Sequence, residues 1–433
     1  DLHSFPTRRS SDLVGEYSEV ILMFNIAVLN KISEIGLNRF TNYYEIVDDI
    51  DKAHGLLLRS QDINQMIFPP NLLAIARAGA GVNNIPIDRC AEHGIVVFNA
   101  PGANANAVKE LVLLGMLMSS RNILPASDWI RQLKSDGENT ISTQVEAGKK
   151  KFLGNELQGK TLGVIGLGAI GVLVANTALK LGMKVIGYDP YLTLKAAHEL
   201  SNKIKITEQL DPLLWQSDFI TMHVPATKDT TGMINSNTIN KMKDGVVLLN
   251  FARDTLVNDF NLAGALKSGK VATYVTDFPN ENILNMENVI ITPHLGASTR
   301  EAEVNCAIMA VDELRDYFES GNIVNSVNFP NCSLGELDTT EVSRICILHK
   351  NIPTMLGKIT GTIADANLNI QNMLNKSKND YAYTLIDVQR GFDENPLIKK
   401  LFDFEGIIGV RVISAMENKN AYQDGKLVIG RNE

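Results

Sequence analysis

The sequence predicts an α/β protein with two doubly wound parallel sheets, followed by a smaller βαββαβ module. Short apolar runs alternate with helical stretches over residues 24–100 and again over 161–293. A glycine-rich turn joins an apolar strand to a helix within the second of these regions, and a different order of strands and helices follows Glu341. Alternating strands and helices are typical of parallel sheets that helices cover on both faces.

Composition narrows the class of protein. A chain of 433 residues, 45% hydrophobic and 21% charged, has the make-up of a globular protein of two or three domains. A net charge of −8 argues against non-specific nucleic-acid binding, so an anionic substrate would need a local cationic pocket. The four cysteines form no CxxC pair, so we expect reduced thiols, no metal site and a cytoplasmic protein. The apolar runs are too short to span a membrane.

Residues 1–22 are polar and aperiodic, and they precede an apolar strand pattern that begins after Met23. We expect a non-native or disordered leader and exclude it from the fold. The first domain is then expected over residues 23–120 and 299–330, discontinuous and flavodoxin-like. Its strands are predicted at 24–29, 54–59, 72–78 and 94–100, its helices at 104–120 and 301–320. Residues 121–158 look polar and irregular.

The second domain, expected over 121–298, contains the most informative segment of the chain. Gly166-x-Gly168-x-x-Gly171 follows an apolar strand and opens a helix, and Asp189 ends the next strand 18 residues later. This context predicts a Rossmann dinucleotide site, with the pyrophosphate at the helix N-terminus and Asp189 on the ribose hydroxyls. Because no basic residue follows until Lys195, NAD is favoured over NADP. A glycine-rich turn without a nucleotide is the alternative.

Three predicted strand ends carry the candidate chemistry of this domain. His294 is the expected acid/base, since an imidazole can accept the hydroxyl proton as hydride leaves a substrate. Arg253 offers a guanidinium fork for a carboxylate, and Glu281 could orient the imidazole. His223 is expected to line the cofactor site. In the first domain, Arg59 with Ser60 and Arg77 follow strands and could bind a second anionic group, helped by Asn104 and Asn106 at a helix start.

Residues 340–414 predict strand, helix, two strands, helix and strand, which is the ferredoxin-like order. The polar tail after residue 414 receives no predicted structure.

Several segments together resemble a known family. GLGAIG, Asp189, HVPAT, NFARD, TDFPNE and PHLGAST, with PGANANAVKEL, resemble the signature segments of D-2-hydroxyacid dehydrogenases. The terminal module looks like an ACT domain, and the resemblance covers residues 24–413. It implies a catalytic Arg–Glu–His trio at Arg253, Glu281 and His294. The family's acid lies in Asp-x-Phe-x-x-Glu-Pro, whereas here the spacing is one residue shorter and Asn282 replaces the proline.

The resemblance also implies ligand contacts. The expected NAD contacts are Gly166, Gly168, Ala169, Ile170, Gly171, Asp189, His223, Val224, Pro225, Phe251, Ala252, Asp277 and Gly296. In the ACT module the expected effector contacts are His349, Asn351 and Asn369, with L-serine as the implied effector. The family's usual glycine is replaced there by Thr354. An oligomerisation module without ligand is the alternative.

The implied activity is NAD-dependent oxidation of 3-phosphoglycerate to 3-phosphohydroxypyruvate, the first step of serine biosynthesis, by a homodimer or homotetramer. One alternative is a relative that acts on glyoxylate, hydroxypyruvate or lactate and lacks the phosphate contacts. Another is a non-catalytic NAD-sensing scaffold, against which the intact Arg253 and His294 argue.

Overall fold

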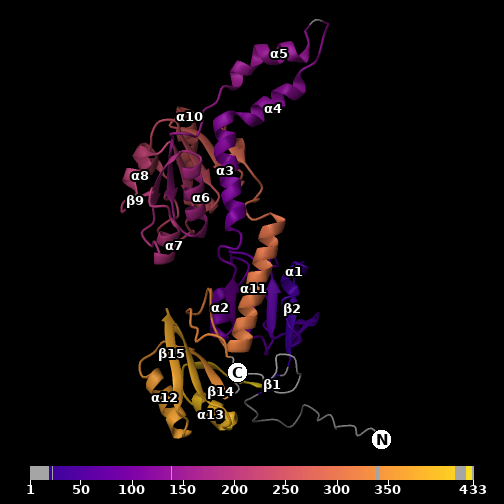
Figure 1. Cartoon of the computed structure of the whole chain (residues 1–433), viewed down its shortest axis with the longest axis vertical. Helices are drawn as coiled ribbons and strands as arrows, with labels where there is room; N and C mark the ends of the chain where they lie inside the picture. Colours follow the sequence, from indigo (N-terminus) through magenta and orange to yellow (C-terminus); the bar gives the residue numbers. More distant parts are fainter. Residues whose placement is uncertain (1–18, 22, 138, 338–340, 415–425, 432–433) are drawn as a thin grey trace. The chain divides into compact units, whose positions relative to one another are not determined.

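The computed structural model describes residues 19–21, 23–137, 139–337, 341–414 and 426–431 (Figure 1). The chain forms two compact units, one from residues 1–101 with 303–433 and the other from residues 102–302. The first unit holds a parallel sheet and the C-terminal module, and the second holds the glycine-rich turn.

The parallel sheet of the first unit has five strands in the order β3-β2-β4-β5-β6. The residues of β4, β5 and β6 are mostly buried and aliphatic, as expected of a sheet covered on both faces, whereas the edge strand β3 is partly exposed. The long helix α11, Arg300–Ser320, returns the chain to this unit, where Phe318 stacks on Phe24 with ring centroids 4.6 Å apart. The elements are β2 Phe24–Val28, α1 Glu34–Leu37, β3 Tyr44–Val47, η1 Ile50–Lys52, β4 Gly55–Leu58, β5 Ala74–Arg77, α2 Ile87–Glu92 and β6 Val96–Asn99.

The second unit is built on a seven-stranded sheet in the order β13-β12-β11-β10-β7-β8-β9. Every pair in it is parallel, so the carboxyl ends of the strands lie along one edge. Its strands are β7 Thr161–Ile165, β8 Lys184–Tyr188, β9 Lys205–Thr207, β10 Phe219–Met222, β11 Val246–Asn250, β12 Val271–Thr276 and β13 Val289–Ile291. Its helices include α6 Ala169–Lys180, α7 Leu194–Glu199, α8 Asp211–Gln216, α9 Ser236–Asn240 and α10 Asp259–Ser268, with short η3 Asp254–Leu256 and η4 Ile283–Asn285.

The boundary expected at residues 120/121 lies instead before helix α3, Ala105–Arg121. This helix belongs to the second unit because it packs on α6 and on the sheet beside it. Gly115 permits the close approach, since a Cβ there would lie 3.1 Å from Val275 and 3.2 Å from Phe251. The apolar character of α3 was predicted, but not the unit that it joins.

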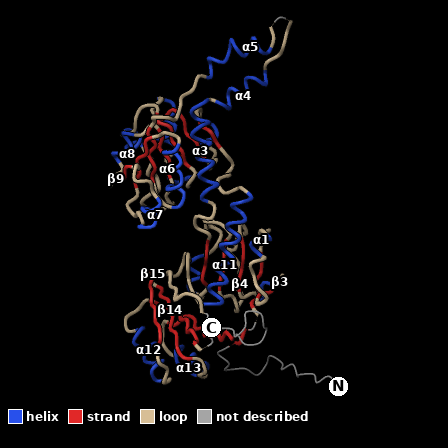
Figure 2. The backbone as a smooth tube through the Cα atoms, viewed as in Figure 1, coloured by secondary structure: helices blue, strands red, loops and turns tan. Residues whose placement is uncertain are grey.

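The expectation of irregular structure over 121–158 is wrong. This segment forms helices α4, Ile123–Gln132, and α5, Ile141–Gly148, followed by η2, Lys149–Phe152. Figure 2 shows α4 and α5 side by side, extending away from the sheet of their unit. Trp129 of α4 packs on Phe152 of η2 with ring centroids 5.3 Å apart, so an aromatic contact joins α4 to the end of this segment.

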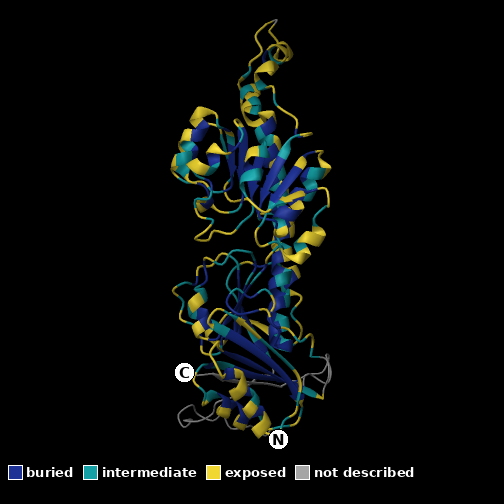
Figure 3. Cartoon of the chain, turned by 90° about the vertical axis from the view of Figure 1, so that its left-hand side faces the viewer, coloured by how far each residue is buried: buried dark blue, intermediate teal, exposed yellow. Residues whose placement is uncertain are grey.

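The C-terminal module has the predicted ferredoxin-like order, with strands β14 Val342–Lys350, β15 Ile370–Lys378, β16 Tyr381–Gln389 and β17 Ile407–Ser414. Helices α12, Met355–Asp365, and α13, Glu394–Phe402, cover the sheet through the aliphatic cluster around Ile359 and Ile398. The central strands β14 and β16 are buried, whereas the edge strand β15 is intermediate or exposed (Figure 3). The tail was expected to lack structure, but β18, Lys426–Arg431, pairs with β17. β1, Glu19–Ile21, from the segment excluded as a leader, pairs with β18 in turn. Residues 1–18 lie outside the described residues.

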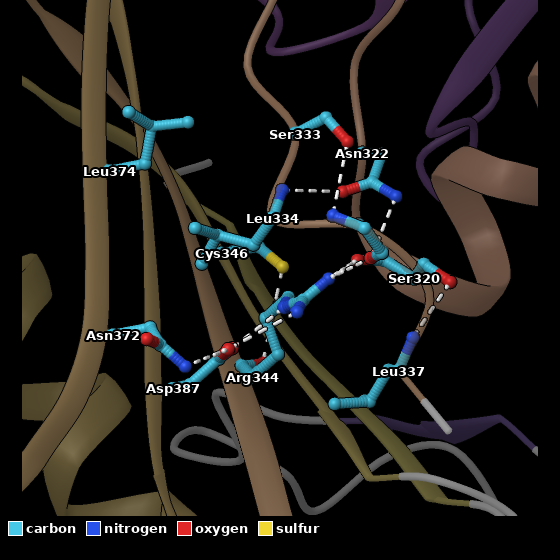
Figure 4. A network of polar contacts seen from close by, with 12 residues as sticks. Ser320, Asn322, Ser333, Leu334, Leu337, Arg344, Cys346, Asn372, Leu374 and Asp387 are labelled. Atoms are coloured by element: carbon cyan, nitrogen blue, oxygen red, sulfur yellow. Dashed lines mark hydrogen bonds and ion pairs between the residues drawn. The ribbon is translucent and has the colours of Figure 1, made fainter. Parts of the chain in front are cut away.

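Buried polar contacts attach this module to the end of α11 (Figure 4). Arg344 is 2% exposed and pairs with Asp387 at 2.7 Å, while its Nη1 donates to the carbonyls of Ser320 and Gly335. Tyr383 donates from its hydroxyl to the Gly321 carbonyl at 2.7 Å. A buried charge held by both a carboxylate and carbonyls fixes the orientation of the module relative to α11 within the first unit.

Candidate active site

The glycine-rich turn between β7 and α6 has the geometry of a dinucleotide cradle. Gly166 has φ +90°, and a Cβ there would lie 2.6 Å from the His223 carbonyl oxygen. A Cβ at Gly171 would overlap the Gly166 carbonyl, whereas a Cβ at Gly168 would meet only open space. The N-terminus of α6 carries no side-chain cap. Unpaired N–H groups therefore face an open approach, which suits a pyrophosphate.

Asp189 follows β8 beside this turn. One carboxylate oxygen accepts a hydrogen bond from the Leu167 amide at 2.8 Å, and the other accepts from the Tyr191 amide at 2.8 Å. The side chain thus fixes the glycine turn from the neighbouring strand. Its half-buried position at the same strand edge is where a ribose acceptor belongs.

His223, Val224 and Pro225 follow β10 and lie against the turn, as the closeness of His223 and Val224 to Gly166 shows. The imidazole Nε2 lies 3.0 Å from the Thr221 hydroxyl, and Nδ1 is buried without a partner in the described part of the chain. Burial lowers the pKa of His223 to about 3. His223 is therefore neutral and is not a general acid/base near pH 7.

His294 is held by a buried carboxylate that the sequence had assigned to the cofactor. Asp277, 1% exposed, accepts from the Thr292 hydroxyl at 2.7 Å, the Leu295 amide at 2.6 Å and the Gly296 amide at 2.7 Å. Its backbone oxygen accepts from the His294 amide at 3.1 Å. His294 adopts φ +54°, a left-handed conformation that a non-glycine residue adopts only where surrounding contacts enforce it. Its ring is exposed and packs on Phe278 at 5.0 Å.

Arg253 lies at the same edge of this sheet. It follows β11, is exposed, and its Nη1 donates to the Ala252 carbonyl at 2.6 Å. Buried Asn250, which sequence reasoning missed, donates to the Arg253 carbonyl at 2.8 Å and accepts from the Ala252 amide. The Asn250 carbonyl also accepts from the Asp277 amide. A chain of backbone contacts thus runs from the Arg253 segment to the His294 segment, with Phe251 buried beneath it.

The expected contact between Glu281 and His294 does not form. Among the described residues of this unit, no hydrogen bond or ion pair joins the two side chains. Glu281 is exposed, and only its backbone oxygen is engaged, by Asn285. Asn280 and Asn282 both donate to Asp259 at 3.1 Å, which ties this loop to α10. The shortened spacing before Asn282 thus coincides with a loop held on another element.

The two arginines of the first unit lie at the ends of adjacent strands, since Leu58 pairs with Arg77 in register. Arg59 forms an ion pair with Glu303 of α11 at 2.7 Å, and Arg77 donates to Asn84 at 3.0 Å. Glu303 was not anticipated, because it lies far away in the sequence. Asn84 also donates to the Arg59 carbonyl. Asn30 accepts from the amides of residues 59–61, including Ser60, so amide side chains build this strand edge.

The remaining predicted residues differ in their surroundings. Asn104 is the N-cap residue of α3 without a side-chain cap bond. Asn106 is exposed and bonds within its own helix, to Glu110 at 2.9 Å and from Lys109 at 2.6 Å. No described group of at least three His, Cys, Asp or Glu side chains could hold a metal, and no described helix is long and apolar enough to cross a membrane.

In the C-terminal module, His349 is 2% exposed and both ring nitrogens are engaged. Nδ1 lies 2.9 Å from the Lys350 carbonyl and Nε2 lies 2.9 Å from the Thr384 hydroxyl, and burial lowers the pKa of the ring. Asn351 is exposed but donates to the Asn379 carbonyl, and Asn369 is exposed. Thr354 has φ +68°, in the region that favours the glycine it replaces.

Comparison with known proteins decides the family. Residues 113–296 match the NAD-binding domain of D-isomer specific 2-hydroxyacid dehydrogenases. A D-3-phosphoglycerate dehydrogenase of Haemophilus influenzae is 33% identical over 85% of this chain and 88% of its own length. The chain belongs to the D-isomer specific 2-hydroxyacid dehydrogenase family. It therefore carries an NAD-binding domain, which the open glycine turn and Asp189 fit.

Other relatives agree with this assignment. A D-3-phosphoglycerate dehydrogenase of Archaeoglobus fulgidus is 37% identical over 66% of this chain, but the chain spans only 54% of that protein. The solved NAD-bound 3-phosphoglycerate dehydrogenase of Entamoeba histolytica has a TM-score of 0.56 and 25% identity, and covers 72% of this chain and 100% of its own. A glyoxylate reductase from Paecilomyes thermophila has a TM-score of 0.58 and 25% identity, and it covers 70% of this chain and 98% of its own.

Proposed function

We propose that this protein oxidises 3-phosphoglycerate with NAD to give 3-phosphohydroxypyruvate. One observation carries the proposal: Asp277 holds His294 in a left-handed turn at the sheet edge that also presents Arg253 and the glycine turn. A base, a carboxylate-binding fork and a dinucleotide cradle at one edge are the parts that oxidation of a 2-hydroxy acid needs.

Bound NAD would accept the hydride from C2 of the substrate. His294 would take the hydroxyl proton, and its exposed ring leaves the nitrogens able to reach that proton. Arg253 would bind the substrate carboxylate by two parallel hydrogen bonds. Glu281 would have to approach His294 on ligand binding to act on it. Asp277 would act as a positioning residue that holds the backbone around His294, rather than as a contact of the cofactor.

The phosphate is the finer part of the proposal. Arg59 and Arg77 supply two cations at adjacent strand ends, and together they suit a phosphate better than an uncharged hydroxymethyl group. The names of the dehydrogenases from Haemophilus and Archaeoglobus point to the same substrate. The glyoxylate reductase neighbour keeps a non-phosphorylated 2-oxo acid as the second candidate.

Steady-state oxidation of NADH tests both candidates. We expect kcat/KM for 3-phosphohydroxypyruvate to exceed that for hydroxypyruvate by at least about tenfold, since one charge-assisted contact contributes that much. Equal values would favour the reductase of small 2-oxo acids. Binding of NADH without turnover of either compound would leave only the NAD-sensing scaffold.

We further propose that the C-terminal module is an ACT domain that binds L-serine. Asn351 and Asn369 are the exposed candidates, whereas His349 would first have to release Thr384 or the Lys350 carbonyl. Addition of serine to the NADH assay should lower the rate in the wild type and not in Asn369→Ala. A wild-type rate that serine does not change would contradict the effector role.

A homo-oligomer is the remaining proposal. Helices α3 and α4 leave a run of large apolar side chains about half exposed, which is unusual for a surface facing only water. They are Leu114, Leu117, Ile123, Leu124 and Ile130. Sedimentation should show dissociation for Ile130→Lys and none for Ile67→Lys, a more exposed isoleucine in the other unit. A wild type that sediments as a monomer would contradict this assembly.

A further inference from the structure

An open cavity of about 640 Å³, with both polar and apolar lining residues, lies in the first unit, between strand β15 of the C-terminal module and the segment that links α11 to that module. Its charged lining residues are Lys376 and Lys378. Asn99, Asn325, Asn331 and Ser377 supply amide and hydroxyl groups around them. No carboxylate is among the described residues that line it. The cavity lies in the first unit, whereas Arg253 and His294 belong to the second.

The two lysines form an uncompensated pair of charges. They are two residues apart on one strand, so both side chains point to the same face, roughly 7 Å apart along the strand. Neither forms an ion pair in the described part of the chain. In a protein with a net charge of −8, two neighbouring ammonium groups without an acid are a local excess of positive charge. They repel each other unless an anion lies between them.

Lys378 shows this most clearly. Its ammonium donates to the carbonyls of Val327 at 2.9 Å and Ser326 at 3.2 Å, which directs it into the lining and leaves one N–H. Burial lowers the pKa of Lys378, and no nearby carboxylate opposes that effect. The acid nearest the lining through hydrogen bonds is Glu313, which accepts from Asn325. Burial raises the pKa of Glu313 to about 8, so it is mostly neutral at pH 7.

The walls of the cavity are held in place without a ligand. Within the linking segment, the Cys332 sulfur lies 3.8 Å from the carbonyls of both Leu374 and Tyr383, and Phe329 packs edge-on against Tyr381 at 5.5 Å. Tyr383 fixes β16, the partner strand of β15, to the carbonyl of Gly321 just after α11, and Arg344 fixes the next strand, β14, to the end of that helix. A preformed cationic cavity with several N–H donors needs little reorganisation to bind an anion.

We propose that this cavity binds a small phosphate-bearing anion between Lys376 and Lys378, at a site separate from the catalytic one. The occupant could be inorganic phosphate or a phosphate ester, because both present the same dianionic oxygens to ammonium and amide donors. An anion held by β15 and the 325–331 segment would join the C-terminal module to the first sheet more tightly.

Amide hydrogen exchange of the full-length protein tests this, with inorganic phosphate and glycerol phosphate added separately against chloride at equal ionic strength. We expect slower exchange in peptides covering 323–331 and 374–380 with at least one of the two anions. Protection by phosphate alone identifies the free ion as the ligand, and protection by glycerol phosphate alone identifies an ester.

Lys376→Glu reverses one charge at an exposed position and should weaken anion binding at least about tenfold, as loss of a charge-assisted contact does. Lys399→Glu, an exposed lysine on α13, makes the same charge change away from the cavity and should leave the protection intact. Arg59→Ala separates this site from the proposed catalytic phosphate site. Protection that disappears in Arg59→Ala but persists in Lys376→Glu would overturn the proposal, as would no protection in the wild type.

Discussion

Asp277 holds the backbone of His294 from both sides: its carbonyl accepts the His294 amide at 3.1 Å, and its carboxylate accepts the amides of the next two residues. Asp277 thus helps to maintain the strained conformation of the proposed base, together with the Thr292 carbonyl, which accepts from the His294 amide at 3.0 Å. Because the positioning carboxylate belongs to Asp277 and the proposed base is His294, mutation can change either residue while keeping the other.

Asp277→Asn should reduce both stability and turnover. The asparagine oxygen can still accept from Thr292 and Leu295, but its NH₂ group would face the Gly296 amide, a donor against a donor. We expect a loss of about 2–3 kcal/mol in the free energy of unfolding. We also expect kcat to fall at least about tenfold because the base is displaced. Denaturant unfolding and NADH assays measure both, with exposed Asp128→Asn as the control. Unchanged kcat would refute the positioning role.

His294→Gln should lower kcat by about 10²–10⁴-fold, since general base catalysis is lost while the ring's packing volume is largely kept. NADH affinity, measured by fluorescence titration, should change little. His223→Gln is the contrasting variant: with its pKa near 3, His223 is neutral across the working range, so its removal should not shift the pH profile of kcat/KM. A shift of the acid limb in His223→Gln would reverse these two assignments.

Arg59 and Glu303 form a matched pair of tests for the phosphate contact. Arg59→Ala should raise KM for 3-phosphohydroxypyruvate about tenfold or more and leave hydroxypyruvate nearly unaffected. Glu303→Gln removes the acid that now neutralises Arg59, so it should lower KM for the phosphorylated compound. We thus expect the two variants to change KM for 3-phosphohydroxypyruvate in opposite directions and to leave KM for hydroxypyruvate nearly unchanged. Equal effects on both substrates would mean that Arg59 does not recognise phosphate.

Thr354→Gly should stabilise the C-terminal module. Thr354 is β-branched and has φ +68°, which costs on the order of 1 kcal/mol that glycine does not incur. Thr354→Ala keeps most of the strain and should not give this gain. Thermal unfolding of the two variants provides the comparison, and equal melting temperatures would show that the left-handed conformation carries no cost here.

The buried carboxyl group of Glu313 should make the stability of the protein depend on pH. Burial raises its pKa from 4.5 to about 8, so the folded state keeps a proton that the unfolded state releases. Its contribution to stability is complete below pH 4.5 and is lost as pH rises through 8. Glu313→Gln can still accept from Asn325 but cannot ionise, so it should gain stability relative to wild type between pH 5 and pH 8. Melting temperatures across that range test this, and parallel curves would contradict it.

The sequence was informative about the site where a local backbone conformation or contact can be met by only one type of residue. The left-handed conformation at residue 166 and the close contact at residue 171 both require glycine, so the spacing of the glycines located the cradle. The ends of the predicted strands located Arg253 and His294 in the same way. Contacts between residues distant in sequence could not be predicted. Nothing near Arg59 indicates Glu303, and nothing near Asn280 indicates Asp259. Helices α4 and α5 escaped prediction although the apolar residues of α4 lie on one face, because the segment looks polar and the two helices bury almost none of their residues.

The pairing of β18 with β17 limits how a second subunit can extend the C-terminal sheet. The two edge strands of this sheet are β1, with three residues, and β15, with nine residues. β15 is therefore the longer edge at which a further strand could pair. A partner strand docking there would run beside Lys376 and Lys378. Assembly through that border and occupation of the neighbouring cavity would then be thermodynamically linked, each shifting the concentration at which the other occurs.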